Sequence, residues 1–191
     1  MQRQSKNSQK SSLRIIGGQW RGRKLSIADA EGLRPTGDRV RETLFNWLAP
    51  WLPGARCLDL FAGTGALGLE ALSRGAAHTT FIETNPHAAA TLCEHLNTLD
   101  CKQADVLRND GIAWLNSAAH TPYDIIFVDP PFAKDLWEQA LTSIERCAVA
   151  SAQALVYIET PVEHALNTPP NWQPLKSKTA GKVRFGLWQV A

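Results

Sequence analysis

The sequence predicts an α/β fold in which a mostly parallel sheet carries helices on both faces. Between residues 57 and 159, short apolar runs typical of buried strands alternate with segments whose apolar residues recur at helical spacing. A glycine-rich turn follows the first of these strands. Strands that alternate with helices form parallel sheets through right-handed crossovers. The 191 residues, 44% of them hydrophobic, suffice for one such domain and a small appendage.

The N-terminal part is expected to be an extension of this domain. Residues 1–12 are polar and predict a disordered basic tail. Residues 13–53 combine glycines, cations and short apolar pieces with a later amphipathic run, which predicts a small hairpin and a helix. Thr36 or Asp38 is the expected N-cap of that helix. Its expected apolar face consists of Val40, Leu44, Trp47, Leu48 and Trp51.

Residues 54–191 are expected to form the main domain. The predicted strands are 57–61, 79–83, a shorter one that ends near Asp105, 124–128 and 154–159. The predicted helices cover 69–73, which follows the turn of residues 62–68, a segment that begins at Pro86, the region of 112–115, and 135–148. Residues 175–179 and 183–190 flank Ala180-Gly181 and predict an antiparallel hairpin at the sheet's edge.

Charge is distributed unevenly along the chain. Residues 1–41 carry ten Lys or Arg against three Asp or Glu, residues 42–163 carry six against fifteen, and residues 164–191 carry four against none. The basic ends therefore suit an anionic polymer, and the acidic middle suits a small cationic ligand. A merely solvated basic tail is the alternative.

Basic residues beside an aromatic side chain can bind phosphate and stack a base. For the predicted hairpin, the segment alone favours two interpretations equally. Its residues either contact phosphate and a base, or Trp20 simply packs on the domain. Cations near a helix start oppose the helix dipole, so there a ligand contact is a better explanation than a structural role. The candidate phosphate-binding residues are Arg14, Trp20, Arg21, Arg23, Lys24, Arg34, Arg39 and Arg41.

The sequence favours neither a metal site nor a membrane protein. The four cysteines form no C-x-x-C pair and are expected to be reduced. His87 and His95 lie two helical turns apart, too far for an i, i+4 ligand pair. No apolar run approaches the roughly 20 residues of a spanning helix, and the N-terminus lacks a signal sequence, so we expect a cytoplasmic protein.

Four carboxylates recur once per predicted strand-helix unit. Asp59, Glu83, Asp105 and Asp129 are 24, 22 and 24 residues apart. We expect each to lie at the C-terminal end of a strand. In open α/β sheets ligands bind in the crevice outside those ends, so the four side chains are expected to line one cleft.

A glycine-rich turn between strand and helix predicts an adenosine-type ligand. Residues 63–68 match G-x-G-x-x-G, and Glu83 follows about 20 residues later, where an acid binds a ribose diol. This pattern fits NAD and S-adenosylmethionine alike. Asp59 favours the latter, because a carboxylate before the glycines repels a pyrophosphate and attracts the ammonium group of a methionine moiety.

Asp129-Pro130-Pro131-Phe132 follows an apolar strand and predicts a pocket for an amine. Two prolines remove two N–H donors, which leaves a peptide edge rich in acceptors. The Asp129 carboxylate and the Pro130 carbonyl can accept both hydrogens of a base NH2, and the Phe132 ring can stack on the base. An ordinary strand-to-loop turn is the alternative.

These motifs resemble a known family. Residues 58–70 together with Asp129-Pro130-Pro131-Phe132 look like a class I S-adenosylmethionine methyltransferase that acts on a base amine. Residues 14–24 and 33–47 narrow the resemblance to the RsmD family, bacterial enzymes that methylate N2 of one guanine, guanine 966, in 16S rRNA. The resemblance covers about residues 13–190 and implies a Rossmann-like fold with a seven-stranded sheet.

The resemblance also implies ligands and roles. S-adenosylmethionine would be the cofactor, S-adenosylhomocysteine the product, and no metal would be needed. The substrate would be 16S rRNA within the small (30S) ribosomal subunit or its assembly intermediate, bound by a monomer through the basic residues named above. Residues 129–132 would receive the guanine. The implied cofactor-binding residues are Asp59, Phe61, Gly63, Thr64, Gly65, Glu83, Thr84, Asp105 and Val106.

Two other functions remain open on the sequence. An N6-adenine or other base-amine methyltransferase on DNA or RNA could use the same acceptor pocket. A non-catalytic RNA-binding assembly factor could keep the fold without turnover, although the complete glycine turn and Asp129 disfavour it.

Overall fold

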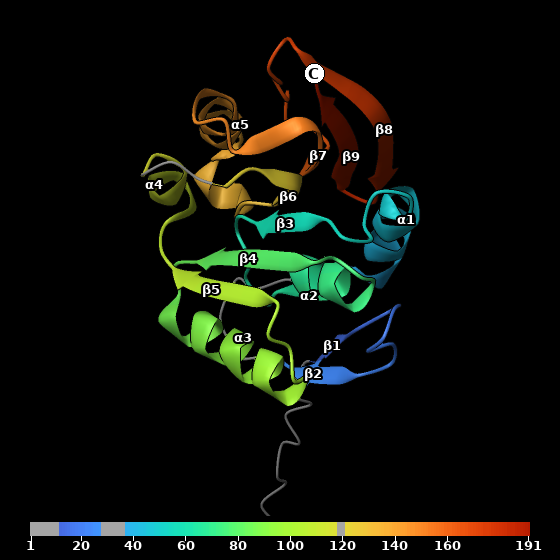
Figure 1. Ribbon diagram of the computed structural model, residues 1–191. Coiled ribbons are helices and arrows are strands. Elements are labelled where there is room, and N and C mark those ends of the chain that lie inside the picture. Colours follow the sequence, from blue (N-terminus) through green and yellow to red (C-terminus); the bar gives the residue numbers. More distant parts are fainter. Residues whose placement is uncertain (1–11, 28–36, 118–120) are drawn as a thin grey trace, which may run out of the picture.

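A seven-stranded sheet forms the centre of the computed structural model, which describes residues 12–27, 37–117 and 121–191 (Figure 1). Its strand order is β5-β4-β3-β6-β7-β9-β8. Strands β3 to β7 pair in parallel, and β9 pairs antiparallel with both β7 and β8, which confirms the predicted sheet and its C-terminal hairpin. The strands are β3 (Arg56–Asp59), β4 (His78–Glu83), β5 (Ala104–Arg108), β6 (Tyr123–Val128), β7 (Ala150–Pro161), β8 (Trp172–Ala180) and β9 (Val183–Val190).

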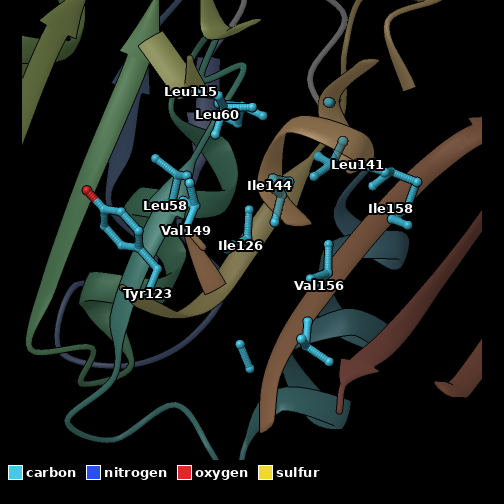
Figure 2. Packing of buried hydrophobic residues seen from close by; sticks show 14 of the residues in the cluster. Leu58, Leu60, Leu115, Tyr123, Ile126, Leu141, Ile144, Val149, Val156 and Ile158 are labelled. Atoms are coloured by element: carbon cyan, nitrogen blue, oxygen red, sulfur yellow. The ribbon is translucent and has the colours of Figure 1, made fainter. Parts of the chain in front are cut away.

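Helices cover both faces of the sheet because its strands alternate apolar side chains between the two sides. The helices are α1 (Asp38–Leu48), α2 (Ala66–Ser73), α3 (Pro86–Thr98), α4 (Gly111–Leu115) and α5 (Trp137–Arg146), with a 3₁₀ turn, η1, at Phe132–Lys134. Figure 2 shows Leu115 of α4 and Leu141 and Ile144 of α5 packed over Leu58, Ile126 and other strand residues. Residues of α1 and α2 pack on the opposite face, against the alternate strand positions.

No membrane-spanning helix occurs within the described ranges, since none of their helices is both long and apolar enough.

The N-terminal hairpin consists of β1 (Ser12–Arg14) and β2 (Lys24–Ser26), as predicted. Leu13, Ile15 and Leu25 are buried with residues of α2, β4 and α3, so the hairpin shares a core with the main domain. In Figure 1 it lies beside α3 and far from β8. A domain boundary at residues 53/54 stays a prediction.

Helix α1 buries most of the predicted face: Leu44 and Leu48 lie in the core, and Val40 and Trp47 are half-buried against it. Arg41, Leu44, Phe45 and Leu48 are its buried residues, whereas Trp51 is 47% exposed. The N-cap position is Gly37, which makes no side-chain cap, and Thr36 lies outside the described residues. The prediction was wrong for Trp51 and missed Phe45 and Arg41, the latter because a charged residue is not expected in a core.

Close packing of α2 on β4 requires a glycine at position 68. A Cβ at Gly68 would lie 2.2 Å from the Phe81 ring. We expect Gly68→Ala to destabilise the fold by about 1–3 kcal/mol, because a buried ring must move. Glu42→Ala is the control: this side chain is exposed on α1, so a change below about 0.5 kcal/mol is expected. Urea unfolding measures both, and equal stabilities would contradict this packing.

Candidate active site

The switch in strand order lies beside β3, at the centre of the sheet. From β3 the chain moves outward through β4 to β5, and it then returns to the other side of β3 to form β6 and β7. The crevice beyond the C-terminal ends of β3 and β6 is therefore the expected ligand site of such a fold. Three of the four predicted carboxylates, Asp59, Glu83 and Asp129, end or follow the strands at this edge.

Asp59 is the last residue of β3 and is buried. Its Oδ2 accepts a hydrogen bond from the Gly68 N–H at 2.9 Å, which ties the strand to α2. Burial raises the pKa of the Asp59 carboxyl from 3.8 to about 7; the Gly68 hydrogen bond opposes this rise and the charge of Glu83 adds to it. A cationic ligand group would favour the ionised form and lower this pKa.

Glu83 ends β4 and connects it to the glycine turn. Its Oε2 accepts from the Gly63 N–H and its Oε1 from the Asn85 N–H, both at 2.7 Å. A carboxylate has further lone pairs, so these bonds leave capacity for a ligand hydroxyl. The spacing of 20 residues thus corresponds to a direct contact between Glu83 and the turn.

The glycine turn has a backbone that only glycine adopts easily. Gly63 and Gly65 have φ values of +53° and +75°, and Gly65 is the N-cap of α2. A Cβ on Gly65 would lie 2.5 Å from the Leu92 side chain. The other predicted cofactor residues of this region flank the turn: Phe61 and Thr64 are half-buried and Thr84 is exposed.

Asp105 lies at the wrong end of its strand for the cleft. Strand β5 extends to Arg108, so the prediction that it ends near Asp105 was wrong. Asp105 pairs with Thr80, and its carboxylate lies 3.1 Å from Nε2 of His78, the first residue of β4. Val106 pairs with Phe81 in the middle of the strands. The regular carboxylate spacing misled, because loop lengths differ between the strand-helix units.

The residues that follow β5 at the ligand edge are Asn109 and Asp110, which the sequence analysis missed. Asp110 is the N-cap of α4, and its Oδ1 accepts from the Ala113 N–H at 2.9 Å. A Cβ on Gly111 would lie 2.9 Å from the Leu60 carbonyl oxygen, so the start of α4 approaches the chain just before the glycine turn. The signal in the sequence was an Asp-Gly pair before an apolar helix.

The Asp129-Pro130-Pro131-Phe132 segment follows β6 directly. Asp129 is half-buried and Pro130 is buried, whereas the Phe132 side chain is 42% exposed. The Phe132 ring lies 5.7 Å from the ring of Trp137, which is buried and donates its indole N–H to the Glu159 carbonyl at 2.7 Å. A fixed indole thus supports an accessible phenyl ring beside the acceptor groups.

Most of the predicted phosphate-binding cations lie on the surface. Arg14, Arg21, Arg23, Lys24 and Arg39 are exposed, whereas Arg34 lies outside the described residues. Arg14 of β1 and Lys24 of β2 are paired in the register of the two strands. Trp20 is half-buried and packs against the core cluster that contains the hairpin. Their RNA contacts stay a prediction.

Arg41 does not belong to this surface, and its predicted phosphate contact was wrong. Its side chain is 1% exposed. It donates to the Arg14 carbonyl at 2.9 Å, pairs with Asp38 at 2.6 Å and lies 3.5 Å from Glu70. A buried arginine needs such compensation, and Glu70, distant in sequence, provides part of it.

Glu70 holds the N-terminal extension against α2. It is fully buried and accepts the N–H groups of Ile16 at 2.9 Å and Gly17 at 2.8 Å. It also pairs with Arg74 at 2.7 Å and with Arg41. Because α2 begins at the glycine turn, Glu70 fixes the N-terminal extension relative to that turn and to the sheet edge where Asp59 and Glu83 lie.

The acceptor groups at this edge fit S-adenosylmethionine. The buried carboxylates of Asp59 and Glu83 suit its ammonium group and ribose hydroxyls, and Gly63 and Gly65 add no side chain to the turn between them. Among the residues that the structure describes, no group of three or more His, Cys, Asp or Glu side chains could hold a metal ion.

Comparisons with known proteins agree with this geometry. A family model described as Conserved hypothetical protein 95 matches residues 13–189. The chain is 49% identical over 184 residues to Ribosomal RNA small subunit methyltransferase D of Escherichia coli (strain K12). The match covers 96% of this chain and 92% of that protein. The chain belongs to the RsmD family. A second RsmD relative, from Haemophilus influenzae, is 47% identical. The match covers 94% of this chain and 95% of that protein.

Solved structures also resemble this RsmD family member. The Escherichia coli protein yhhF has a TM-score of 0.89 at 46% identity, over 94% of this chain and 98% of that chain. SMU.776, solved in complex with SAH, has a TM-score of 0.76 at 17% identity, over 97% of this chain and 57% of that chain, which shows the fold alone. The fold is the Rossmann-like fold of S-adenosylmethionine-dependent methyltransferases.

We expect Glu70→Ala to destabilise the protein by about 3–5 kcal/mol, because it removes one of the two carboxylates beside the buried Arg41 and leaves the N–H groups of Ile16 and Gly17 without their acceptor. A double variant, Glu70→Met with Arg41→Met, should lose less, since both charges are removed together. The exposed Glu94→Ala is the control and should change stability by less than about 0.5 kcal/mol. Denaturant unfolding measures all three; a Glu70→Ala variant as stable as the control would refute the role of this cluster.

Proposed function

We propose that the protein transfers a methyl group from S-adenosylmethionine to the exocyclic N2 amine of one guanine in small-subunit ribosomal RNA. One observation carries this proposal: the Asp129 to Phe132 acceptor segment follows β6, and β6 pairs directly with β3, which ends at Asp59 beside the glycine turn. The proposed amine pocket and the proposed cofactor site would therefore be neighbours on one edge of the sheet. Membership in the RsmD family and the ribosomal RNA methyltransferase names of its relatives support the substrate.

The cofactor would be held along the ends of β3, β4 and β5. Asp59 would hold its ammonium group and Glu83 its ribose hydroxyls, and the turn of Gly63 and Gly65 would lie against the cofactor. We assign the adenine amine to Asp110 instead of Asp105, because Asp110 follows the C-terminal end of β5. When bound, S-adenosylmethionine supplies an electrophilic methyl group on a sulfonium.

The protein's own contribution to the reaction is positioning and charge stabilisation. The N2 lone pair of guanine is delocalised into the ring, which makes the amine a poor nucleophile. Hydrogen bonds from its two N–H groups to the Asp129 carboxylate and the Pro130 carbonyl orient that lone pair out of the ring plane and stabilise the positive charge that develops on nitrogen. Phe132 stacks on the base and offsets the few kcal/mol needed to take a guanine out of its stack.

We expect Asp129→Ala to lower methyl transfer by about 100-fold or more, because one of two acceptors for the amine is lost. Binding of S-adenosylmethionine, measured by calorimetry, should change less than about twofold, since Asp59 and Glu83 are intact. Asp135→Ala is the matched control, an exposed carboxylate just beyond η1. Near-normal turnover of Asp129→Ala on unmethylated small subunits would remove Asp129 from the mechanism.

The raised pKa of Asp59 predicts pH-dependent cofactor binding. The ammonium group prefers the ionised carboxylate, which forms as the pH rises through about 7. Affinity should therefore increase by up to about tenfold from pH 6 to pH 7.5 and then level off.

The ligand-free fold should show the opposite trend: a raised carboxyl pKa means that stability falls between pH 3.8 and about 7.

Asp59→Asn separates these effects. The variant should bind S-adenosylmethionine more weakly at pH 7.5 and lose the increase in affinity with pH, because the amide does not titrate. Calorimetric titration at a series of pH values provides the measurement. A wild-type affinity that is flat between pH 6 and pH 7.5 would contradict the assigned contact between Asp59 and the ammonium group.

A further inference from the structure

The C-terminal hairpin exposes a second group of cations, distinct from those of the N-terminal extension. Lys176, Lys178 and Lys182 are exposed, and residues 164–191 contain no Asp or Glu. Within the described ranges these lysines form no ion pair. Arg184 differs from them, since it is half-buried and donates to the Val162 carbonyl at 2.9 Å. We call the three lysines the hairpin lysines.

The strand register shows which face of the sheet carries two of them. Lys176 pairs with Leu187 and Lys178 with Phe185. Paired residues of neighbouring strands project to the same face. Phe185 and Leu187 are buried against α1, and the Phe185 ring stacks on Trp47 of α1 at 5.4 Å. Lys176 and Lys178 therefore project on the α1 side of the sheet.

The same register relates these lysines to the amine pocket. Lys178 is aligned with Phe185, and Phe185 with Glu159 on β7. Val128 is aligned with Ile158, so Asp129 follows at the level of Glu159. Three strand spacings separate the two positions, which places the backbone of Lys178 about 14 Å from that of Asp129.

Strand direction places Lys182 at the same edge. Strand β8 has the direction of β7, because each is antiparallel to β9. The turn after β8, where Lys182 lies, is therefore at the edge where β6 and β7 end. A cation here is available to a polymer that enters the amine pocket.

We propose that the hairpin lysines bind phosphates of the RNA segment that flanks the target guanine; this rests on the function proposed above. Figure 1 shows the β8–β9 hairpin and the β1–β2 hairpin at opposite ends of the sheet. The RNA would then contact basic surfaces on both sides of an otherwise acidic domain. Lysines on edge strands can also serve only to prevent edge-to-edge pairing, but that role does not account for Lys182, which lies in the turn.

The test compares two variants that remove the same net charge. Lys176→Gln/Lys178→Gln lowers the charge by two, as does Arg146→Glu. Arg146 is exposed at the end of α5, which packs on the opposite face of the sheet and precedes β7, so it lies at the edge away from the pocket. Lys182→Gln tests the turn separately.

Binding to small subunits that lack the modification is measured over a salt series with the S-adenosylhomocysteine-loaded protein. The double variant should bind on the order of tenfold more weakly at low salt, and its slope of log affinity against log salt should fall by about 1–2. Its KM for the particle should rise equally, with kcat and cofactor affinity unchanged. Lys182→Gln should lower the slope by about half as much, and Arg146→Glu should match wild type.

Unchanged affinity and an unchanged salt slope in the double variant would overturn the proposal. An equal loss of affinity in Arg146→Glu would also overturn it, because the effect would then reflect net charge alone. Self-association of the double variant on size exclusion, with an unchanged salt slope, would overturn it in favour of edge protection. Because binding is measured without turnover, its outcome does not depend on which nucleoside is methylated. Failure of the proposed reaction would appear separately, in the identity of the product.

Discussion

The arrangement of the molecule depends on one buried carboxylate, Glu70. It accepts two backbone N–H groups of the N-terminal extension and is accompanied by the guanidinium groups of Arg41 and Arg74. A buried charge is costly unless it is paired and hydrogen-bonded, and here two of the partner segments, residues 16–17 and α1, are distant in sequence. The cluster therefore fixes the hairpin, α1 and α2 relative to one another. Since α2 begins at the glycine turn, the cluster also holds the basic N-terminal extension in place relative to the sheet edge of the proposed cofactor site.

Charge is divided between two tasks. Carboxylates occupy the sheet edge, where Asp59 and Glu83 end adjacent strands and Asp129 follows the next one. They suit a cofactor with an ammonium group, ribose hydroxyls and a sulfonium, and an amine as the acceptor. Cations lie at the ends of the chain, on hairpins at opposite ends of the sheet (Figure 1). In the proposed function, the cations would attract a polyanion and the carboxylates would hold the cofactor.

The sequence predicted those features that depend on local pattern. The alternation of strands and helices, the glycine turn with Glu83, the acceptor segment at Asp129 and the C-terminal hairpin all have signals within a few residues, and the structure confirms their positions. Arg41 and Asp105 were misplaced for a different reason. The burial of Arg41 depends on Glu70, which no local pattern reveals, and the position of Asp105 depends on loop lengths that vary between units. The predicted ligand and RNA contacts of individual side chains stay predictions.

We propose that the two neighbouring sites on this edge together methylate a guanine amine. The most direct measurement incubates the protein with methyl-labelled S-adenosylmethionine and small ribosomal subunits that lack the modification, digests the RNA and identifies the labelled nucleoside by mass spectrometry. Naked rRNA and DNA serve as parallel substrates. Label in N2-methylguanosine from the subunits is the expected result. Label in a methylated adenine, label confined to DNA, or no label on any substrate would contradict it.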